Sequence, residues 1–372
     1  MNSWVSGWTK KRYKEVCKDL CTCFIKRGFS LSDDRGYEAL ITSDTCMYIS
    51  SFEKMRKEII KRTSIVCFID TRGTNAHPDV FDANAGWVLW NHPGANIKGS
   101  YFKLNHPIPE KQAGLLEALA NPDCGWFYRA DANGFEAIPG SPIAYWVSAS
   151  LRVAFKQGQS LEHYALPKKG LGTGNKELFM RCWWEIGLDG ICFDARNVTE
   201  AQKSRKRWFP HNKGGEFRKW YGNDEYVVDW EHNGSRIKAY HNEAGQLAAR
   251  PQNQDEYFKP CISWSKISSG KLAFRYKPVG SIFNEVAPAF FSDRSSSFRL
   301  EAFLNSSVCA EVAKAISPTL DFQVGQVASY PVLQEVLESS QTSAIVESLT
   351  VSSRNDWDSF ETSYGFKRHP LA

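Results

Sequence analysis

The first ninety or so residues alternate between helical and extended patterns, and this alternation restricts the fold more than any other feature. Apolar residues recur at helical spacing between Tyr13 and Phe29, and the capping box Ser50 to Glu53 opens a second helix that ends near Lys61. Apolar runs predict strands at 37–41, 64–70 and 86–90. This order of helix, strand, helix, strand, loop and strand is typical of α/β domains.

The remaining sequence is less regular. A length of 372 residues predicts two or three domains at roughly 150 residues each. Helical periods cover 110–120, 145–156, 298–316 and 332–349, and the clearest later strands are 226–230, 237–240 and 272–276. We expect a strand-rich and loop-rich second part between residues 166 and 330, followed by helices.

Positive charge is concentrated in one segment. The chain carries a net charge of +5, yet the stretch from Lys203 to Lys219 alone carries +6. Aromatic residues alternate with these cations up to Tyr221. Cations neutralise phosphates and aromatic rings can stack on bases, so the segment predicts contact with nucleic acid rather than a merely solvated basic face. The candidate DNA-binding residues are Lys203, Arg205, Lys206, Arg207, Trp208, Lys213, Gly214, Gly215, Arg218, Lys219 and Trp220.

A dense glycine cluster lies at residues 170–175. A Rossmann-like cofactor turn would need a buried strand just before it, and Pro167 interrupts the preceding stretch. We therefore favour a loop whose backbone amides approach phosphate. Its candidate DNA-binding residues are Gly172, Thr173, Gly174 and Asn175.

Cysteine usage and hydropathy exclude several classes of protein. Ten cysteines form no Cys-x-x-Cys pair, and the closest group, at positions 17, 21 and 23, has no histidine within fifty residues. Reduced thiols are therefore favoured over a zinc site. No apolar run approaches the ~18 residues of a membrane span, and Met1–Arg12 has no apolar stretch typical of a signal peptide. We expect a cytoplasmic protein without bound metal or membrane contact.

Seven stretches resemble the PglX family, the adenine-specific DNA methyltransferases of BREX phage-defence systems, which are related to single-chain restriction–modification enzymes. They include GLGTGNKELFMRCWWEI and RWFPHNKGGEFRKWYGNDEYVVDW. The stretches occur in the same order as in the family and cover nearly the whole chain. They are 36–59, 138–148, 170–186, 207–230, 262–276, 317–332 and 355–371.

The resemblance implies a domain organisation. Residues 1–91 would form the late half of a class I methyltransferase sheet, of Rossmann-like α/β architecture, and residues 92–140 a connecting region. Residues 141–332 would form an α+β target recognition domain that binds double-stranded DNA, and residues 333–372 a helical tail. Within the recognition domain, Lys266 and Ser268 of the stretch 262–276 are further DNA-binding candidates.

The resemblance also implies an activity, the transfer of a methyl group from S-adenosylmethionine to adenine N6 at a defined DNA sequence. The family's cofactor loop and Asn-Pro-Pro-Tyr motif precede the region where this chain starts, and the sequence contains no Pro-Pro. Asn121-Pro122-Asp123-Cys124 lacks the second proline, so it is predicted to be a turn. We expect a chain that binds DNA but neither binds the cofactor nor methylates alone.

Two kinds of partner follow from this expectation, besides DNA. One is a missing N-terminal methyltransferase half, and the other is a further BREX component. The alternative interpretation is a free-standing interaction protein, which binds DNA or docks on an intact methyltransferase and modulates it. A decayed gene product remains a third interpretation.

Overall fold

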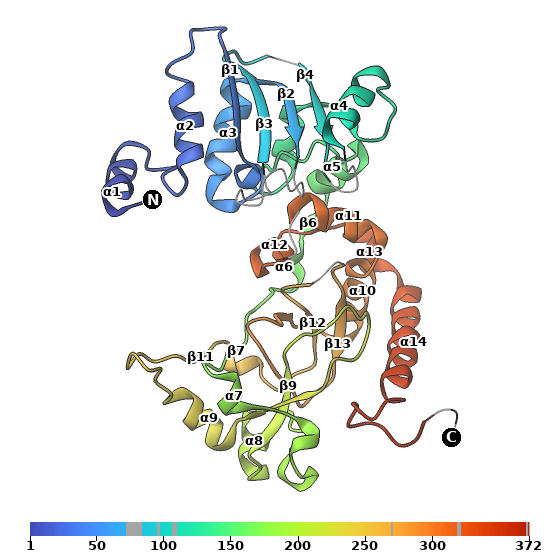
Figure 1. Ribbon diagram of the computed structural model, residues 1–372. Helices are drawn as coiled ribbons and strands as arrows, with labels where there is room; N and C mark the ends of the chain where they lie inside the picture. Colours follow the sequence, from blue (N-terminus) through green and yellow to red (C-terminus); the bar gives the residue numbers. More distant parts are fainter. Residues whose placement is uncertain are drawn as a thin grey trace. The chain divides into compact units, whose positions relative to one another are not determined.

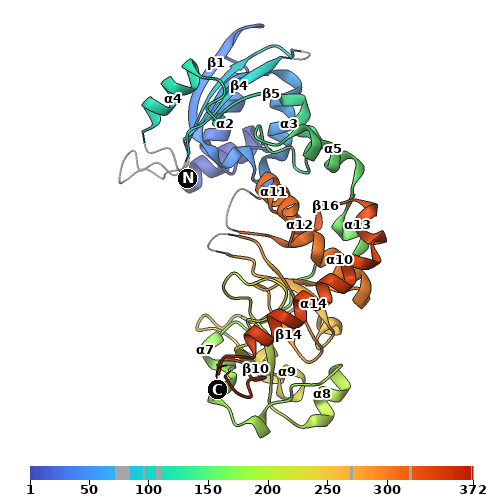
Figure 2. The same cartoon turned by 90° about the vertical axis from the view of Figure 1, so that its right-hand side faces the viewer.

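The computed structural model describes residues 1–71, 84–94, 97–105, 110–268, 271–317, 321–369 and 371. The chain divides into two compact units, unit 1 (Met1–Lys156) and unit 2 (Gln157–Ala372). Both units mix helices with strands, as Figures 1 and 2 show. The mixed α/β character predicted from the sequence is confirmed, whereas the functional boundaries at residues 91, 140 and 332 stay predictions.

Unit 1 is built on a five-stranded sheet in the order β1-β3-β2-β4-β5. Strand β3 is antiparallel to both β1 and β2, and Trp90 is opposite Tyr37 of β1 and Ser64 of β2. Strands β1 and β2 are therefore parallel to each other, with helix α3 between them in the chain. The strands are β1 (Tyr37–Ser43), β2 (Ser64–Asp70), β3 (Asn84–Trp90), β4 (Lys98–Lys103) and β5 (Phe127–Asp131).

Helices pack on the two faces of this sheet. The main core contains Phe68 of β2 and Ile59 of α3, whereas Cys67 and Ile69, on the other face of β2, pack with Ala118 of α4. Alternate residues of one strand thus meet different helices, as the period of two requires. The helices are α1 (Ser3–Arg12), α2 (Leu20–Gly28), α3 (Glu53–Arg62), α4 (Lys111–Ala120) and α5 (Ala149–Gln157).

A buried arginine ties the end of unit 1 to its helices. Arg56 of α3 is fully buried, and its guanidinium donates to the carbonyl oxygens of Cys46 (2.9 Å) and Ile49 (2.8 Å). It also donates to the carbonyl of Gly140 at 2.6 Å. Burial lowers the pKa of Arg56 to about 10, so the group stays charged at neutral pH. These bonds hold residues 138–145 in place, and Tyr145 completes the core.

Unit 2 contains several small sheets. The largest has the order β14-β9-β10-β8, the next is β13-β12-β15, and two pairs, β11-β7 and β16-β6, complete the set of the described residues. The strands are β6 (Gln159–Ser160), β7 (Leu171–Gly172), β8 (Met180–Cys182), β9 (Trp208–Asn212), β10 (Tyr226–Asp229), β11 (Arg250–Pro251), β12 (Cys261–Trp264), β13 (Phe274–Lys277), β14 (Ile282–Phe283), β15 (Ala289–Phe290) and β16 (Pro331–Val332).

The helices of unit 2 are short except near the C-terminus. In Figure 1 the C-terminal helices appear in orange and red, and α10 lies next to β12 and β13. They are α6 (Leu161–Tyr164), α7 (Lys176–Phe179), α8 (Val198–Ser204), α9 (Glu231–Lys238), α10 (Arg294–Leu304), α11 (Ser307–Ile316), α12 (Val324–Ala328), α13 (Gln334–Glu338) and α14 (Ser340–Trp357). No helix of the described ranges is both long and apolar enough to cross a membrane.

Some predicted elements are wrong in detail. The first predicted helix begins only at Leu20, and Ser50 does not cap α3, because a short 3₁₀ turn, Ser50–Phe52, precedes that helix. The predicted helix 298–316 is two helices, since Asn305 turns its side chain to both backbone groups of Phe274 (3.0 Å each). The predicted helix 332–349 corresponds to α13 and to the first ten of the 18 residues of α14, which continues to Trp357.

Two further predictions concern single segments. The predicted strand 237–240 is wrong, because Ile237 and Lys238 form the last turn of α9. The turn predicted at Asn121 is confirmed: the amide of Asp123 donates to its side-chain oxygen at 3.1 Å.

Candidate nucleic-acid interface

The basic segment begins at the end of helix α8. The side-chain oxygen of Asn197 accepts from the amide of Glu200 at 2.9 Å, which is the bond expected of an N-cap residue. Arg205 follows the last helical residue with a φ of 52°, the left-handed conformation that commonly ends helices. This turn leaves Arg205 and Arg207 exposed and Lys206 half-buried, just before strand β9.

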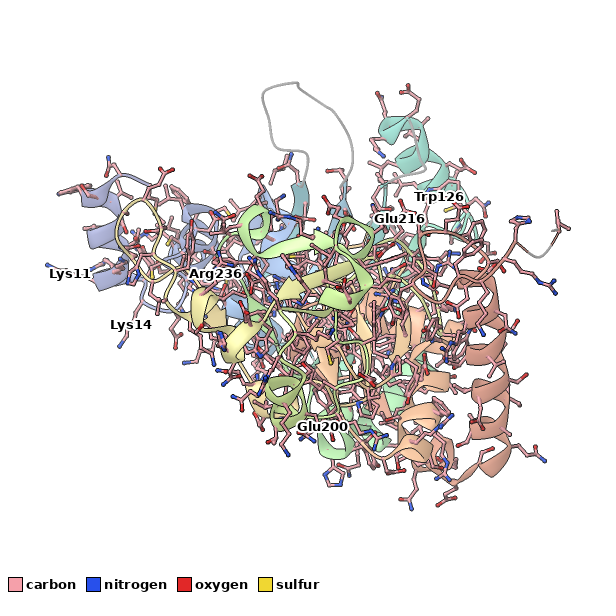
Figure 3. All side chains as sticks on the ribbon, turned by 90° about the horizontal axis from the view of Figure 1, so that it is seen from below. Lys11, Lys14, Trp126, Glu200, Glu216 and Arg236 are labelled. Carbon is pink, nitrogen blue, oxygen red and sulfur yellow. The ribbon has the colours of Figure 1, made fainter. Side chains whose placement is uncertain are left out.

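One buried carboxylate holds two arginines beside this turn. The side chain of Asp229, at the end of β10, is 1% exposed. Its Oδ2 accepts from Arg207 at 2.9 Å and also from Arg236 of α9, which Figure 3 labels. A single negative charge is shared by two guanidinium groups that both reach solvent, so excess positive charge remains at the surface. We name Lys203, Arg205, Lys206, Arg207 and Arg236 the α8–α9 cluster.

Strand β9 divides the basic segment into two groups. All five residues of β9 are buried, and a strand of that length spans roughly 15 Å. The α8–α9 cluster lies before it, and the cations from Lys213 onward follow it. Glu200 of α8 and Glu216 of the second group are well separated in Figure 3. The cations of this one segment therefore lie at two places on unit 2.

The second group starts with a glycine loop. After the half-buried Lys213, Gly214 and Gly215 have φ of 84° and 140°. Gly215 exchanges two hydrogen bonds with the hydroxyl of Ser265, at 3.1 and 2.8 Å, and a Cβ at Gly215 would lie 2.8 Å from the side chain of Asn223. Packing within unit 2 thus accounts for both glycines. Close approach of a DNA backbone to this loop stays a prediction.

The other cations of the second group have partners within unit 2. Arg218 pairs with Asp356 at 2.8 Å, and the ammonium of Lys219 donates to the carbonyl of Asn305 at 2.5 Å. Trp220, next in the chain, is half-buried and has a φ of 71°. These contacts make the second group a weaker candidate for phosphate binding than the α8–α9 cluster, because each cation would exchange one partner for another.

Lys266 and Ser268 follow Ser265, the residue whose hydroxyl bonds to Gly215 of the glycine loop. The backbone of the half-buried Lys266 bonds to Phe322 at 2.7 Å. The hydroxyl of Ser268 donates to the carbonyl of Lys271 at 2.9 Å. Ser265 thus brings the start of this segment next to the glycine loop, although the two are about fifty residues apart in the chain. DNA contact by Lys266 and Ser268 stays a prediction.

Residues 172–175 hold local structure together. Gly174 has a φ of 74°, and a Cβ there would lie 2.8 Å from Ala248. Asn175 caps α7, and its amide nitrogen donates to the hydroxyl of Tyr240 at 3.0 Å. Both polar atoms of the Asn175 side chain are therefore already hydrogen-bonded within unit 2. A phosphate contact there stays a prediction.

Most aromatic residues of the basic segment belong to the core. Trp208 is 7% exposed, and its ring lies under the guanidinium of Arg207 at 5.2 Å. Phe209 and Tyr221 are buried, whereas Phe217 is 48% exposed. Trp208 therefore offers little surface for stacking on a base, and its contribution is to support Arg207 from below.

Sequence reasoning missed Arg236 and Trp230. Arg236 lies outside the basic segment of the sequence, yet the structure places it beside Arg207 on the same carboxylate. Trp230 packs under the first turn of α9. The Asn233-Gly234 pair, a common turn dipeptide, was the signal that pointed to a turn here.

The described ranges show neither a metal site nor a cofactor cradle. Among the described residues, no group of three or more His, Cys, Asp or Glu could hold a metal ion. The glycine cluster is filled by the protein itself: a Cβ at Gly170 would lie 1.9 Å from the carbonyl oxygen of Phe283, and one at Gly172 2.9 Å from the carboxylate of Glu285. Thr173 is buried. These residues do not fit S-adenosylmethionine.

The chain is similar in sequence to two curated methyltransferases. It is 35% identical over 367 residues to "Adenine-specific methyltransferase PglX" of Lacticaseibacillus casei (strain Zhang), covering 97% of this chain and 30% of that protein. It is 29% identical over 378 residues to "Adenine-specific methyltransferase BrxX" of Escherichia coli O9:H4 (strain HS), covering 100% of this chain and 29% of that protein. The chain thus spans about 30% of the length of these relatives.

A family model and a solved structure agree with these relatives. Residues 2–77 match the family described as Eco57I restriction-modification methylase. The type IIL restriction-modification enzyme MmeI, solved in complex with DNA, matches with a TM-score of 0.56 and 9% identity, over 100% of this chain and 50% of that chain. At this identity the structural match shows a common fold alone.

Proposed function

The chain is related to the PglX adenine-specific methyltransferases, as its motifs predict, and from this relationship we propose that it is part of a site-specific DNA adenine-N6 methyltransferase in which unit 2 recognises DNA. The relatives are more than three times as long, so methylation belongs to the longer enzyme. In that enzyme S-adenosylmethionine supplies the methyl group. The glycine cluster of this chain does not fit the cofactor, and the chain's proposed contribution is DNA binding.

The α8–α9 cluster carries the proposal. Arg205 makes no ion pair among the described residues, and Arg207 and Arg236 share one carboxylate. Phosphate oxygens would supply the negative charge that Asp229 alone does not provide. Contacts of this kind fix the register of a protein on DNA, while other side chains read the bases. Their affinity falls steeply with salt because bound counterions are released.

The fold supports the same proposal. In unit 1, β1, α3 and β2 form a β-α-β unit with parallel strands, which is the unit of doubly wound α/β folds. This arrangement is compatible with the late part of a class I methyltransferase sheet. Unit 2 has no such α/β layering in its described residues and presents short strands, loops and clustered cations, which suits a recognition module.

Replacement of Arg205, Lys206 and Arg207 by alanine tests the proposal. We expect the variant to lose affinity for all duplex sequences by more than tenfold at low salt. The slope of log affinity against log salt should flatten by up to roughly 3, because each phosphate contact contributes about 0.9. Fluorescence anisotropy with labelled duplexes at several salt concentrations measures both quantities.

A matched control removes the same charge elsewhere. Lys259, Arg294 and Lys367 are exposed in unit 2 and lie outside the α8–α9 cluster, so their replacement by alanine should leave the salt slope nearly unchanged. Equal loss in both variants would indicate attraction by net charge alone. Unchanged affinity of the first variant would remove the α8–α9 cluster from the interface.

One observation favours a second candidate function, docking on a methyltransferase. An apolar groove of about 290 Å³ runs over β1, β3 and β2 in unit 1, and Ile41 beside it is 83% exposed. Exposed apolar surface of this kind is typical of interfaces. If docking were the main role, the chain would bind a purified methyltransferase of this family tightly. Replacement of Arg205, Lys206 and Arg207 by alanine would then leave its affinity for that methyltransferase unchanged.

A further inference from the structure

A short hairpin, residues 240–248, projects from unit 2 between α9 and β11, where Figure 1 draws it in yellow. Its two legs pair through a bridge between His241 and Leu247, and the amide of Ala248 donates to the carbonyl of Tyr240 at 3.1 Å. Every residue from 241 to 247 is exposed, so this part of the hairpin lies outside the core of unit 2. Its role must therefore lie at the surface.

The tip of the hairpin is ordered by its own hydrogen bonds. The side-chain oxygen of Asn242 accepts from the amides of Ala244 (3.1 Å) and Gln246 (2.9 Å). The amide of Asn242 donates to the carbonyl of Gln246 at 2.9 Å, and Gly245 completes the turn with a φ of 71°. A segment that is already ordered loses little conformational entropy when it binds a partner, which favours a recognition element over a simple connection.

Both legs of the hairpin are fixed to the loop at residues 172–175. The hydroxyl of Tyr240 accepts from the amide nitrogen of Asn175 at 3.0 Å. On the other leg, Ala248 lies so close to Gly174 that a Cβ at this glycine would be 2.8 Å away. Strand β11, directly after the hairpin, pairs with β7. The hairpin thus has a firm base, which is the condition for placing a side chain precisely on a target.

Charge is distributed unevenly along the hairpin. The exposed Arg236, a member of the α8–α9 cluster, precedes it, and the exposed Arg250 follows it. Between residues 241 and 247 the sequence has no lysine or arginine, and Glu243 carries the one formal charge at neutral pH. The side chains of Glu243 and Gln246 make no hydrogen bond or ion pair with the described residues. Cations therefore flank the hairpin, whereas its tip offers an uncharged amide and a carboxylate.

We propose that the hairpin 240–248 enters the major groove of duplex DNA and that Gln246 and Glu243 read base edges there. The inference rests on the proposed DNA binding of unit 2 and adds the element that selects the sequence. The major groove admits a two-stranded β-ribbon and presents a distinct pattern of donors and acceptors for each base pair. Glutamine can form two bonds with adenine N6 and N7, and glutamate accepts from cytosine N4.

The same charge distribution argues against two other roles of the hairpin. Phosphate binding requires cations, and these lie beside the hairpin instead of at its tip, so the flanks suit the DNA backbone and the tip suits the bases. A protein interface is usually centred on aromatic or large apolar anchors. Among residues 240–248, all of which the structure describes, Leu247 is the one large apolar side chain that is mainly exposed.

Selection of bound sequences from a randomised duplex library tests the proposal with the full chain. We expect the original chain to enrich a motif. Gln246→Ala and Glu243→Ala should each lose the preference at about one or two base pairs of that motif and keep the rest. On the enriched duplex each variant should bind about tenfold less tightly, the usual discrimination of a good base contact. On an unrelated duplex Gln246→Ala should bind within about threefold of the original chain, because phosphate contacts dominate there.

Two controls remove the same chemical groups elsewhere. Gln341→Ala and Glu335→Ala change exposed residues of α14 and α13, outside the hairpin and the α8–α9 cluster. Both should enrich the original motif. Glu335→Ala also shows how much of the effect of Glu243→Ala comes from net charge alone.

A modified base tests the groove. Replacement of a purine by its 7-deaza analogue removes N7, an acceptor that faces the major groove. At the base pair read by Gln246, the analogue should weaken binding of the original chain about as much as Gln246→Ala does. It should not weaken Gln246→Ala further, since the contact is already lost.

The outcomes separate the hairpin from the general DNA interface. Failure of the original chain to bind any duplex would contradict the proposed function itself. Duplex binding with no enriched motif, or with the same motif in the original chain and both hairpin variants, would overturn base reading by the hairpin alone. A 7-deaza duplex that binds as tightly as the natural one would overturn the assignment to the major groove.

Discussion

Single buried side chains decide how the basic residues of unit 2 are presented. Arg275 of β13 is almost fully buried, and its guanidinium donates to the hydroxyl of Ser265 and to the carbonyl of Arg218, both at 3.0 Å. Burial lowers the pKa of Arg275 to about 10, so it remains charged at neutral pH. It thereby links β13 to the glycine loop and to the cations that follow, which limits how far this part can move.

His211 of β9 makes unit 2 sensitive to acid. Its ring is buried between the carbonyl of Ile282 (2.9 Å) and the side chain of Asn284 (2.8 Å), and burial lowers its pKa from 6.5 to about 4. Because the folded pKa lies below the unfolded one, this stability is fully present above about pH 6.5 and is lost as the pH falls toward 4. We expect a loss of about 2 kcal/mol between pH 7 and pH 5.

Urea denaturation of the original chain, His211→Asn and the exposed-site control His241→Asn at the two pH values measures this loss. His211→Asn should lose about 2 kcal/mol less than the other two proteins on acidification. A comparison between variants is required because burial raises the pKa of Glu301, which acts in the opposite direction. The same pH dependence in all three proteins would contradict the role of His211.

Among the elements, the left-handed turn of α9 has the most specific requirement. Gly234 needs a positive φ and also the absence of a side chain, because Trp230 lies against it. Gly245 has a similar φ of 71°, but a Cβ added there would meet nothing within 4 Å in the described part of the chain. The two glycines therefore separate backbone strain from steric overlap.

Alanine at Gly245 should cost about 1–2 kcal/mol of unfolding free energy, the cost of a left-handed non-glycine residue. Alanine at Gly234 should cost about 1–3 kcal/mol more, because the methyl group overlaps the indole ring. Urea denaturation of both variants gives the difference. Equal costs would mean that the turn can shift without disturbing Trp230. The rigid packing of Gly234 against Trp230 would then be contradicted.

Strand β1 is the element of unit 1 most exposed to association. It pairs only with β3 among the described strands, and its residues at 37, 39 and 41 form an exposed face beside the apolar groove. An edge strand with an apolar face is a template for pairing with another chain. We therefore expect the purified chain to self-associate through β1.

Ile41→Lys should reduce this association, because a charge on an edge strand opposes strand pairing. Light scattering at increasing protein concentration should show a lower mean mass for Ile41→Lys than for Leu119→Lys. The latter introduces the same charge at an exposed leucine of α4. A strictly monomeric original chain, or equal effects of the two variants, would contradict association through β1.

Over the whole molecule, each unit has its own hydrophobic core. The core of unit 2 joins residues from Leu171 to Ala289, and that of unit 1 joins residues from Val16 to Tyr145. The first residues of unit 2 are joined to a segment near its C-terminal helices. Strand β6 pairs with β16, and the amide of Leu161 donates to the carbonyl of Tyr330 at 2.9 Å. Separate cores are the physical condition for independent folding.

We therefore expect a fragment of residues 157–372 to fold and to bind duplex DNA within about threefold of the full chain's affinity, since the α8–α9 cluster lies entirely within it. Circular dichroism during heating tests the folding, and anisotropy tests the binding. A fragment that aggregates would contradict the separate core, and a folded fragment that binds more than tenfold less tightly would place part of the interface in unit 1.

Much of this architecture could be read from local sequence. The strands at 64–70 and 226–229, the helix at 111–120 and the turn at Asn121 follow from periodicity and turn residues, which depend on near neighbours in the chain. The family resemblance and the concentration of charge between Lys203 and Lys219 are likewise properties of the sequence itself. These features required no knowledge of which distant segments meet.

The arrangement of the candidate site depends on contacts between distant segments. Burial of β9 separates the basic residues into two groups, and Asp229 joins Arg207 to Arg236 across 29 positions of the chain. The left-handed turn at His232 runs against local preference and is held by packing on Trp230. Periodicity and propensity describe how a residue relates to its neighbours along the chain, whereas long-range packing fixes which charges are neutralised and where a cavity remains.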